Sequence, residues 1–234
     1  MTRGQGTLLV LAFLGNLAGA ETLHYSVNWQ SGLSLGEAAL RSEKLSAEPE
    51  TESGGGQAAG WKFELSLDAA VPGFAIRDEY SSSTDDKLCT SQVQKAVTRG
   101  SRKTVEKTQI DSENHTATRE TQNGGGKSQY SVPGCVHDAM AFLQFVRQEL
   151  AQGRISPQQP VILGAKYDVQ VTYAGTDTIR VAGENVAVDR VKVAIKGPMA
   201  DVTADLYFSH DELRTPVLAR IPLTLGTFTV ELLP

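Results

Sequence analysis

Residues 135–153 form the one long segment after the amino terminus whose apolar side chains recur at helical spacing. Pro133 and Gly134 precede it, and Gly153 can end it in the left-handed conformation that closes many helices. Asp138 can lie in the first turn, where the positive helix end stabilises a carboxylate. The apolar face comprises Val136, Ala139, Met140, Leu143, Val146 and Leu150, widened by Phe142 and Phe145, and the polar face carries Gln144, Arg147, Gln148 and Gln152. A lone amphipathic helix needs a surface to cover, and the remaining chain predicts that surface as strands.

Alternation of apolar and polar side chains predicts those strands. Residues 23–30 and 61–68 alternate without error, as half-buried strands do. Val188 and Val191 are out of phase with each other, which indicates a bulge near residues 189–190 that would curve the sheet. We therefore predict a mainly β fold: one curved antiparallel sheet, or open half-barrel, of about 9–11 strands with the helix against its concave face.

One polar stretch, residues 81–86, has the composition of a turn. Asp78, Glu79 and Asp85 lie in it or beside it and would be the members of any carboxylate site here. We interpret the stretch as an ordinary turn, because serine, threonine and aspartate favour turns without any further role. Residues 71–80 lose the period of two, so we expect them to seal one end of the sheet.

Residues 1–20 are typical of an export signal peptide. A basic residue is followed by an apolar core at residues 8–14 and by small residues up to Ala20, near which we expect cleavage. The apolar core is shorter than the roughly 20 residues that cross a bilayer, and no membrane span is predicted in the mature chain. We expect residues 21–234 to form a single β-rich domain in the periplasm or outside the cell, with a flexible loop at residues 48–60.

The charge of the chain argues against nucleic acid as a partner. The net charge is −5, and the one basic cluster, residues 99–103, is followed by residues of mixed charge. Binding to phosphates requires clustered lysine and arginine that release counterions, and such a cluster would need to be larger.

Cys89 and Cys135 are the only cysteines of the chain. In an oxidising compartment two such cysteines usually pair, so we predict a disulfide between the sheet and the start of the helix. A metal site that used both cysteines and His137 is the alternative, but a closed zinc site requires four ligands and the fourth is missing at recognisable spacing. We predict no metal and no cofactor.

Two short stretches contain residue types used in catalysis. Ser209, His210 and Asp211 are adjacent, and neighbours on an extended segment point to alternating sides, so a serine triad is not expected there. His137 and Asp138 would be an acid–base pair, but Asp138 already has a structural role at the helix start. We predict no catalytic residues and keep a hydrolase as the least favoured alternative.

Several stretches resemble a family of exported bacterial proteins, domain-of-unknown-function family 3108. The matching stretches are residues 25–29 (YSVNW), 136–140 (VHDAM), 182–188, 207–211 (YFSHD) and 214–232, of which residues 222–231 are the most specific. The resemblance extends over nearly all of the mature chain. It implies a curved antiparallel sheet around a helix, similar to periplasmic lipoprotein carriers, and it implies no catalytic residue.

A trough between the helix and the sheet would suit an apolar or lipid-like ligand of the cell envelope. The predicted trough residues are Trp29, Trp61, Phe63, Phe142, Tyr167 and Val169. Each buried methylene contributes about 0.8 kcal/mol, so even a short acyl chain would bind usefully. In one alternative the helix side chains fill the trough completely. In another the protein is an envelope scaffold that recruits a protein partner through its sheet edges.

Overall fold

The computed structural model describes residues 19–47, 58–71, 74–122, 125–224 and 226–234. The predicted signal peptide and flexible loop lie mostly outside these ranges. The first strands are β1 (Ala20–Trp29), β2 (Ser34–Leu45), β3 (Gly60–Val71), β4 (Phe74–Asp85), β5 (Thr90–Arg99), β6 (Arg102–Asp111), β7 (Thr116–Thr121) and β8 (Gly126–Ser131). Then follow β9 (His137–Asp138), helix α1 (Ala139–Ala151), β10 (Gln159–Ile162), β11 (Lys166–Val181), β12 (Glu184–Lys196), β13 (Asp201–Ser209), β14 (Pro216–Leu223) and β15 (Gly226–Leu232).

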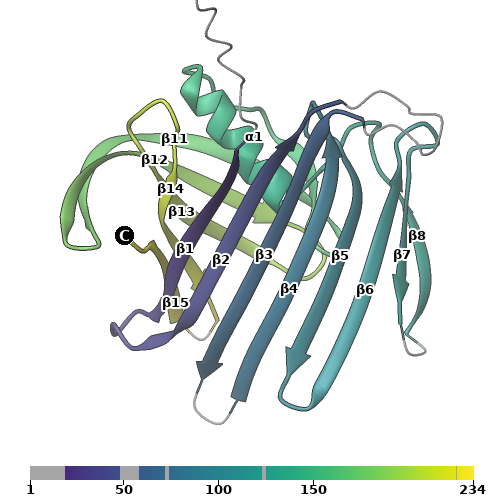
Figure 1. The fold of residues 1–234 in the computed structure, drawn as a ribbon, viewed down its shortest axis with the longest axis horizontal. Coiled ribbons are helices and arrows are strands. Elements are labelled where there is room, and N and C mark those ends of the chain that lie inside the picture. The colour runs from purple at the N-terminus through teal and green to yellow at the C-terminus, as the bar shows by residue number, and fades with distance from the viewer. Residues whose placement is uncertain (1–18, 48–57, 72–73, 123–124, 225) are drawn as a thin grey trace, which may run out of the picture.

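All these strands belong to one sheet in the order β8-β7-β6-β5-β4-β3-β2-β1-β15-β14-β13-β12-β11-β10-β9. Every pair is antiparallel except β9 with β10, which is parallel. Because β15 returns to pair with β1, the sheet has two walls: a first wall of β1–β8 and a second wall of β10–β15. The second wall passes behind the first, with α1 between them at one end (Figure 1). The predicted curved sheet with one helix is therefore confirmed.

The sheet has 15 described strands, more than the predicted number. The largest omission is β4, whose last residues were interpreted as a turn. Its inward side chains include Asp78, Ser82 and Thr84, which are all buried. A strand whose inner face is polar lacks the apolar alternation by which we recognised the others.

The predicted bulge is present, but the extra residue belongs to β11. The register of β11 against β12 shifts between Tyr173 and Gly175, opposite Val191 and Arg190. Beyond the shift, the β11–β12 hairpin lies on the outer face of the second wall. Val181 and Val188 form a buried cluster there with residues of β13 and β14, and the Ala182 amide donates to Glu231 Oε1 at 2.9 Å. This part of the molecule is two layers thick.

Helix α1 begins later than predicted, at Ala139 instead of near residue 135. Asp138 is its N-cap: the carboxylate accepts hydrogen bonds from the Met140 and Ala141 amides at 2.9 and 3.4 Å. His137 and Asp138 are extended because they pair with β10. The end of the helix is as predicted, since Gly153 is left-handed with a φ of +68°.

Both walls contact the helix. Met140 and Ala141 are buried with Phe63 and Leu88 against the first wall, whereas Phe142, Val146 and Leu150 are buried against Tyr167, Val169 and their neighbours in the second. Arg147, predicted on the polar face, is buried instead. Its guanidinium makes two hydrogen bonds to the Glu21 carboxylate, at 2.6 and 3.0 Å, and so attaches the helix to β1.

The start of the helix is fastened to the first wall by covalent and polar bonds. The predicted disulfide joins Cys89 to Cys135. Next to it, the Thr90 hydroxyl donates to Asp138 Oδ2 at 2.8 Å and accepts from the Asp138 amide at 2.8 Å. The Thr90 amide donates to the Val136 carbonyl at 2.9 Å. Because β9 pairs with β10 at the edge of the second wall, these bonds connect that edge to the start of β5.

We expect removal of the disulfide to destabilise the fold. The bond closes a loop with a sequence separation of 46 residues, and loss of such a constraint costs about 4 kcal/mol in the loop-entropy model, with about 2 kcal/mol as the lower end of typical values. Urea unfolding of the Cys89→Ser/Cys135→Ser double variant measures this loss. A free energy of unfolding equal to that of the wild type would contradict the prediction.

The Thr90→Val substitution keeps the shape of the side chain and removes the hydroxyl. It leaves the Asp138 amide and one carboxylate oxygen buried without their partner, which costs about 1–3 kcal/mol. Thr178→Val, on an exposed part of β11, serves as the control and should change stability by less than about 0.5 kcal/mol. Equal effects of the two substitutions in urea unfolding would show that the Thr90 hydroxyl contributes nothing.

Candidate functional site

An apolar cavity of 570 Å³ lies between the two walls next to the start of α1. The first wall contributes Tyr25, Val27, Ala38, Leu40, Leu65 and Leu67. The second wall contributes Leu206, Leu218, Ala219, Ile221, Phe228 and Val230, and the helix contributes Ala139, Met140 and Leu143. Every lining side chain is apolar apart from the hydroxyl of Tyr25. We call this space the apolar cavity.

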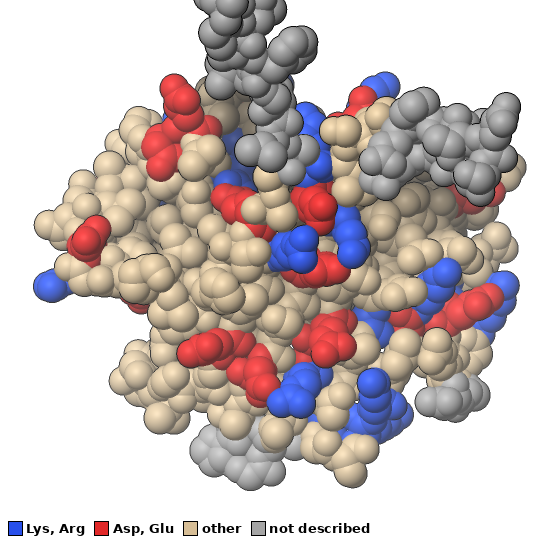
Figure 2. Space-filling model, in the orientation of Figure 1, with Lys and Arg blue, Asp and Glu red and all other residues tan. Residues whose placement is uncertain are grey.

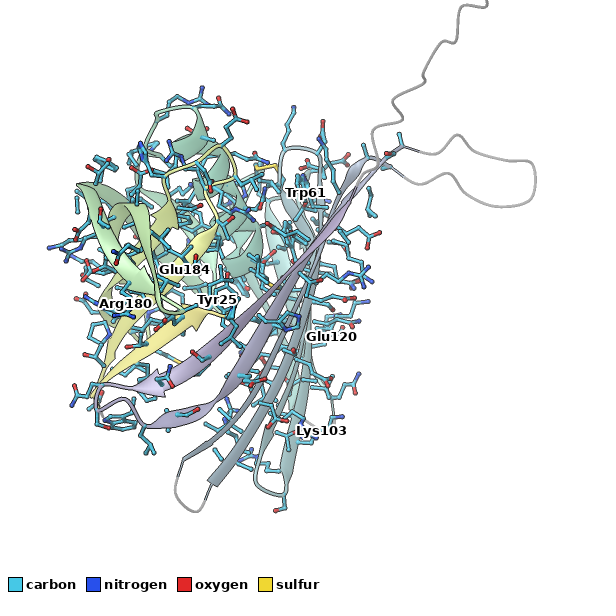
Figure 3. The ribbon with its side chains drawn as sticks, turned by 60° about the vertical axis from the view of Figure 1, so that its left-hand side comes forward. Tyr25, Trp61, Lys103, Glu120, Arg180 and Glu184 are labelled. Carbon is cyan, nitrogen blue, oxygen red and sulfur yellow. A yellow bond between two sulfur atoms is a disulfide. The ribbon has the colours of Figure 1, made fainter. Side chains whose placement is uncertain are left out.

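Tyr25 carries the one side-chain hydroxyl of the lining. It extends from β1 toward the strands of the second wall (Figure 3), and its hydroxyl donates to the Pro216 carbonyl at 3.0 Å. Burial raises the pKa of Tyr25 well above its ordinary value, so the side chain stays neutral. Because the hydroxyl is already bonded, the apolar cavity recognises a ligand through apolar contact.

A second cavity, of 360 Å³, adjoins the first. The two share Leu65, Leu67, Ala139 and Met140 as lining residues. The second is also lined by polar side chains of β4, β5 and β6, namely Asp78, Tyr80, Lys95, Glu106 and Thr108. We call it the polar cavity. The two cavities thus lie side by side, an apolar one and a polar one, on either side of these four residues.

Asp78 is the most buried acidic group of β4. Arg99 donates to both of its carboxylate oxygens, at 2.6 Å to Oδ2 and by a short contact to Oδ1, and this ion pair raises the pKa of Arg99. The Tyr80 hydroxyl also donates to Asp78, at 3.4 Å. Burial, and then the nearby Asp78 charge, raises the pKa of Tyr80 to about 12. Asp78 therefore has its charge compensated inside the protein.

Lys95 and Glu106 are paired less closely. Their charged atoms are 4.0 Å apart, which is too long for a hydrogen bond. Lys95 Nζ also lies 5.9 Å from the centre of the Tyr80 ring, within the range of a cation–π interaction. The Lys95 side chain is 35% exposed, so water reaches this end of the polar cavity.

The six predicted trough residues do not line either cavity. Phe63 is buried with Leu88 under the helix, and Phe142, Tyr167 and Val169 fill the space between the helix and the second wall. Trp61 stacks on Phe63 with ring centres 5.9 Å apart. Trp29 packs edge-on against Phe228, which does line the apolar cavity, at 4.9 Å. Side chains thus fill much of the predicted trough, and the cavity lies beside it.

The sequence did contain a signal for the position of the apolar cavity. Ala38, Ala69, Ala139 and Ala219 all line the apolar cavity, from two walls and the helix. Small side chains at inward positions leave space that a large side chain would occupy. The large residues on which the trough prediction depended occupy such space themselves, so they mark the filled part of the interior instead of the cavity.

The other candidate sites do not assemble. Asp78 is committed to Arg99, and Asp85 accepts hydrogen bonds from the amides of its own turn. Ser209 donates to Asp211 at 2.9 Å within a turn, while His210 contacts Asp189 instead of Ser209, at 3.0 Å. Across the described ranges, no three His, Cys, Asp or Glu side chains are grouped closely enough to hold a metal ion.

The hollows on the outer face of the first wall are lined mainly by polar and charged side chains. Figure 2 shows acidic and basic side chains interspersed over this face. Several form exposed ion pairs, among them Arg41–Glu43, Lys62–Glu64 and Arg77–Asp68. Such pairs contribute little stability and are typical of a solvated surface. No helix in the described part of the chain is long and apolar enough to cross a membrane.

Comparisons with known proteins agree with this architecture. The family described as "Protein of unknown function (DUF3108)" matches residues 24–233. The chain belongs to this family. The resemblance seen in the sequence is thereby confirmed, and the curated proteins give no match.

Among solved structures, the chain is similar to a beta-barrel-like protein of domain of unknown function DUF1849 from Brucella abortus. The TM-score is 0.60 at 7% identity, over 91% of this chain and 94% of the other. At this identity the likeness concerns the fold alone. The DUF3108 chain thus shares its overall architecture with a protein of another family, also of unknown function.

A substitution into the apolar cavity distinguishes empty space from packed core. Ala38→Phe places a large side chain into the cavity and should change the free energy of unfolding by less than about 1 kcal/mol. Ala117→Phe, at a fully buried position of β7, should cost about 1–3 kcal/mol or more, because the core there is filled. Urea unfolding of both variants provides the comparison, and equal losses would mean that the cavity is not available.

Proposed function

We propose that this protein binds an apolar, lipid-like molecule in the apolar cavity and that it does so in the cell envelope. The observation that carries the proposal is the cavity itself, which is lined by aliphatic and aromatic side chains. Its volume lies within the range of about 300–1,000 Å³ that is usual for ligand pockets. Most protein interiors are filled, so a lined space of this size in a single domain favours a binding role.

The energetics suit a hydrocarbon chain. Each methylene transferred from water into such a space contributes about 0.8 kcal/mol. A chain of several methylenes therefore offsets the cost of immobilising the ligand, which is several kcal/mol. No polar anchor is required for affinity, which agrees with a lining whose single hydroxyl is already bonded.

Export supports the envelope part of the proposal. Residues 1–20 have the composition of a signal peptide, and the Cys89–Cys135 bond is of the kind that persists in oxidising compartments. Binding ranks above catalysis in this proposal, because His210 contacts Asp189 instead of Ser209 and so does not complete a serine triad. Asp78 and Asp138 do line the polar cavity, but Arg99 engages the first and the Thr90 hydroxyl and the helix amides engage the second.

Two adjacent alanines of β2 allow a matched test. Ala38 lines the apolar cavity, whereas Ala39 lies on the outer face in a polar surface hollow. We expect the wild-type mature protein to bind dodecanol in calorimetric titration and Ala38→Phe to weaken that binding by about ten-fold or more, since the new ring occupies the ligand space. Ala39→Phe should bind as the wild type does. A wild-type protein that binds no apolar probe, and carries none in native mass spectrometry, would refute the proposal.

A second candidate function rests on β8. This strand ends the sheet, and nearly all of its residues are exposed, so its backbone groups on one side could pair with a strand of a partner protein. Lys127 on this strand, paired with Glu120, is the kind of residue that discourages such pairing. We therefore rank the scaffold function second.

A further inference from the structure

The apolar cavity lies directly beside a polar one, and this arrangement specifies the ligand more closely. An amphiphile that reached from one cavity to the other would place its chain among the apolar residues and its head group among the side chains of β4–β6. Leu65, Leu67, Ala139 and Met140 line both cavities, so chain and head group would meet at these four side chains. Water reaches the polar cavity at Lys95, whose side chain is 35% exposed, and this suits a hydrated head group.

The charges at the polar end determine which head group fits. The guanidinium of Arg99 balances the charge of Asp78. The Asp138 carboxylate caps the helix and accepts hydrogen bonds from the Thr90 hydroxyl and two backbone amides. These two acidic groups are therefore committed to the protein. Lys95 and Glu106 remain, 4.0 Å apart and without a hydrogen bond between them.

Arg119 on β7 adds a second positive charge. It pairs in register with Thr108, which lines the polar cavity, and its guanidinium donates to the carbonyl of Gly164, another lining residue, at 3.0 Å. Among the residues that the structure describes, neither Lys95 nor Arg119 donates a hydrogen bond to a carboxylate. Lys95 and Arg119 thus carry two positive charges without a hydrogen-bonded carboxylate, and the negative charges of Glu106 and of the capping Asp138 oppose them.

We propose that the ligand is an anionic amphiphile, whose carboxylate or phosphate binds Lys95 at the polar cavity while its chain occupies the apolar cavity. This inference rests on the proposed function. Lys95 is the basic residue among the lining side chains of the polar cavity, and its ammonium has donors available for the head group. Arg119 adds attraction from the neighbouring strands, whereas Glu106 opposes it. Lys95 and Glu106 should therefore affect anion binding with opposite signs.

The test compares dodecanoate with dodecanol, which have the same chain and differ in head-group charge. Calorimetric titrations use the mature protein at neutral pH, below the micellar concentration. Lys95→Gln should weaken dodecanoate binding by about ten-fold, the size expected for loss of a charge-assisted hydrogen bond, and change dodecanol binding less than about two-fold. Glu106→Gln should strengthen dodecanoate binding several-fold and again leave dodecanol binding unchanged.

Lys107→Gln is the matched control. Lys107 is next to Glu106 on β6, pairs with Gln94 and has its side chain on the opposite face of the sheet. Its loss changes the net charge by the same amount as Lys95→Gln. If long-range charge alone governed binding, the two lysine variants would behave alike, and that result would overturn the assignment of Lys95. Circular dichroism and urea unfolding confirm that each variant is folded.

The outcomes separate the two proposals. If both probes bind and Lys95→Gln selectively weakens dodecanoate, the inference is supported. If both probes bind and Lys95→Gln alters neither affinity, the inference is wrong while the proposed function stands. If neither probe binds to the wild type, both fail. A phosphate-headed probe, dodecyl phosphate, tests whether the site accepts either anion, and inorganic phosphate without a chain should bind at least about a hundred-fold more weakly because it gains no apolar burial.

Discussion

The central constraint on this fold is that one helix of 13 residues packs against two walls of a 15-stranded sheet. The surface that these walls turn toward each other is larger than a short helix can cover. On one flank of α1, Phe142, Val146 and Leu150 pack closely against the second wall. On the other, the helix covers only part of the first wall, and the cavities occupy the remainder. The cavities are thus a consequence of a helix that is too short to cover the facing surfaces of both walls.

Where the helix lies depends on the bonds at its start. The disulfide, the Thr90–Asp138 hydrogen bonds and the N-cap act within a few residues of one another. They hold the first turn of α1, and with it Ala139 and Met140, at the boundary between the two cavities. Further along, the buried Arg147 attaches the helix to Glu21 of β1. These bonds fix the shape of the cavities, and one of the bonded residues, Asp138, also lines the polar cavity.

Sequence reasoning recovered the elements whose inner face is apolar. Strands such as β1 and β3, the helix end at Gly153, the disulfide and the irregularity beside Arg190 were all predictable, because each leaves a local pattern. Strand β4 was not, since its inner face carries Asp78, Ser82 and Thr84. The polar residues that hid this strand are next to those that give the polar cavity its character. Arg147 was misplaced for a related reason: its partner, Glu21, is distant in sequence, and no local pattern reveals such a pair.

The two walls differ in thickness. The β11–β12 hairpin lies over the outer face of the second wall, where Val181 and Val188 are buried and the Ala182 amide bonds to Glu231. Most of the first wall, in contrast, is a single layer with a solvated outer surface. Bending a single layer disturbs fewer packed contacts than bending two layers. We therefore expect the second wall with its hairpin to be rigid and the first wall to bend more easily. A change in the width of the space between the walls would therefore displace mainly β2–β6.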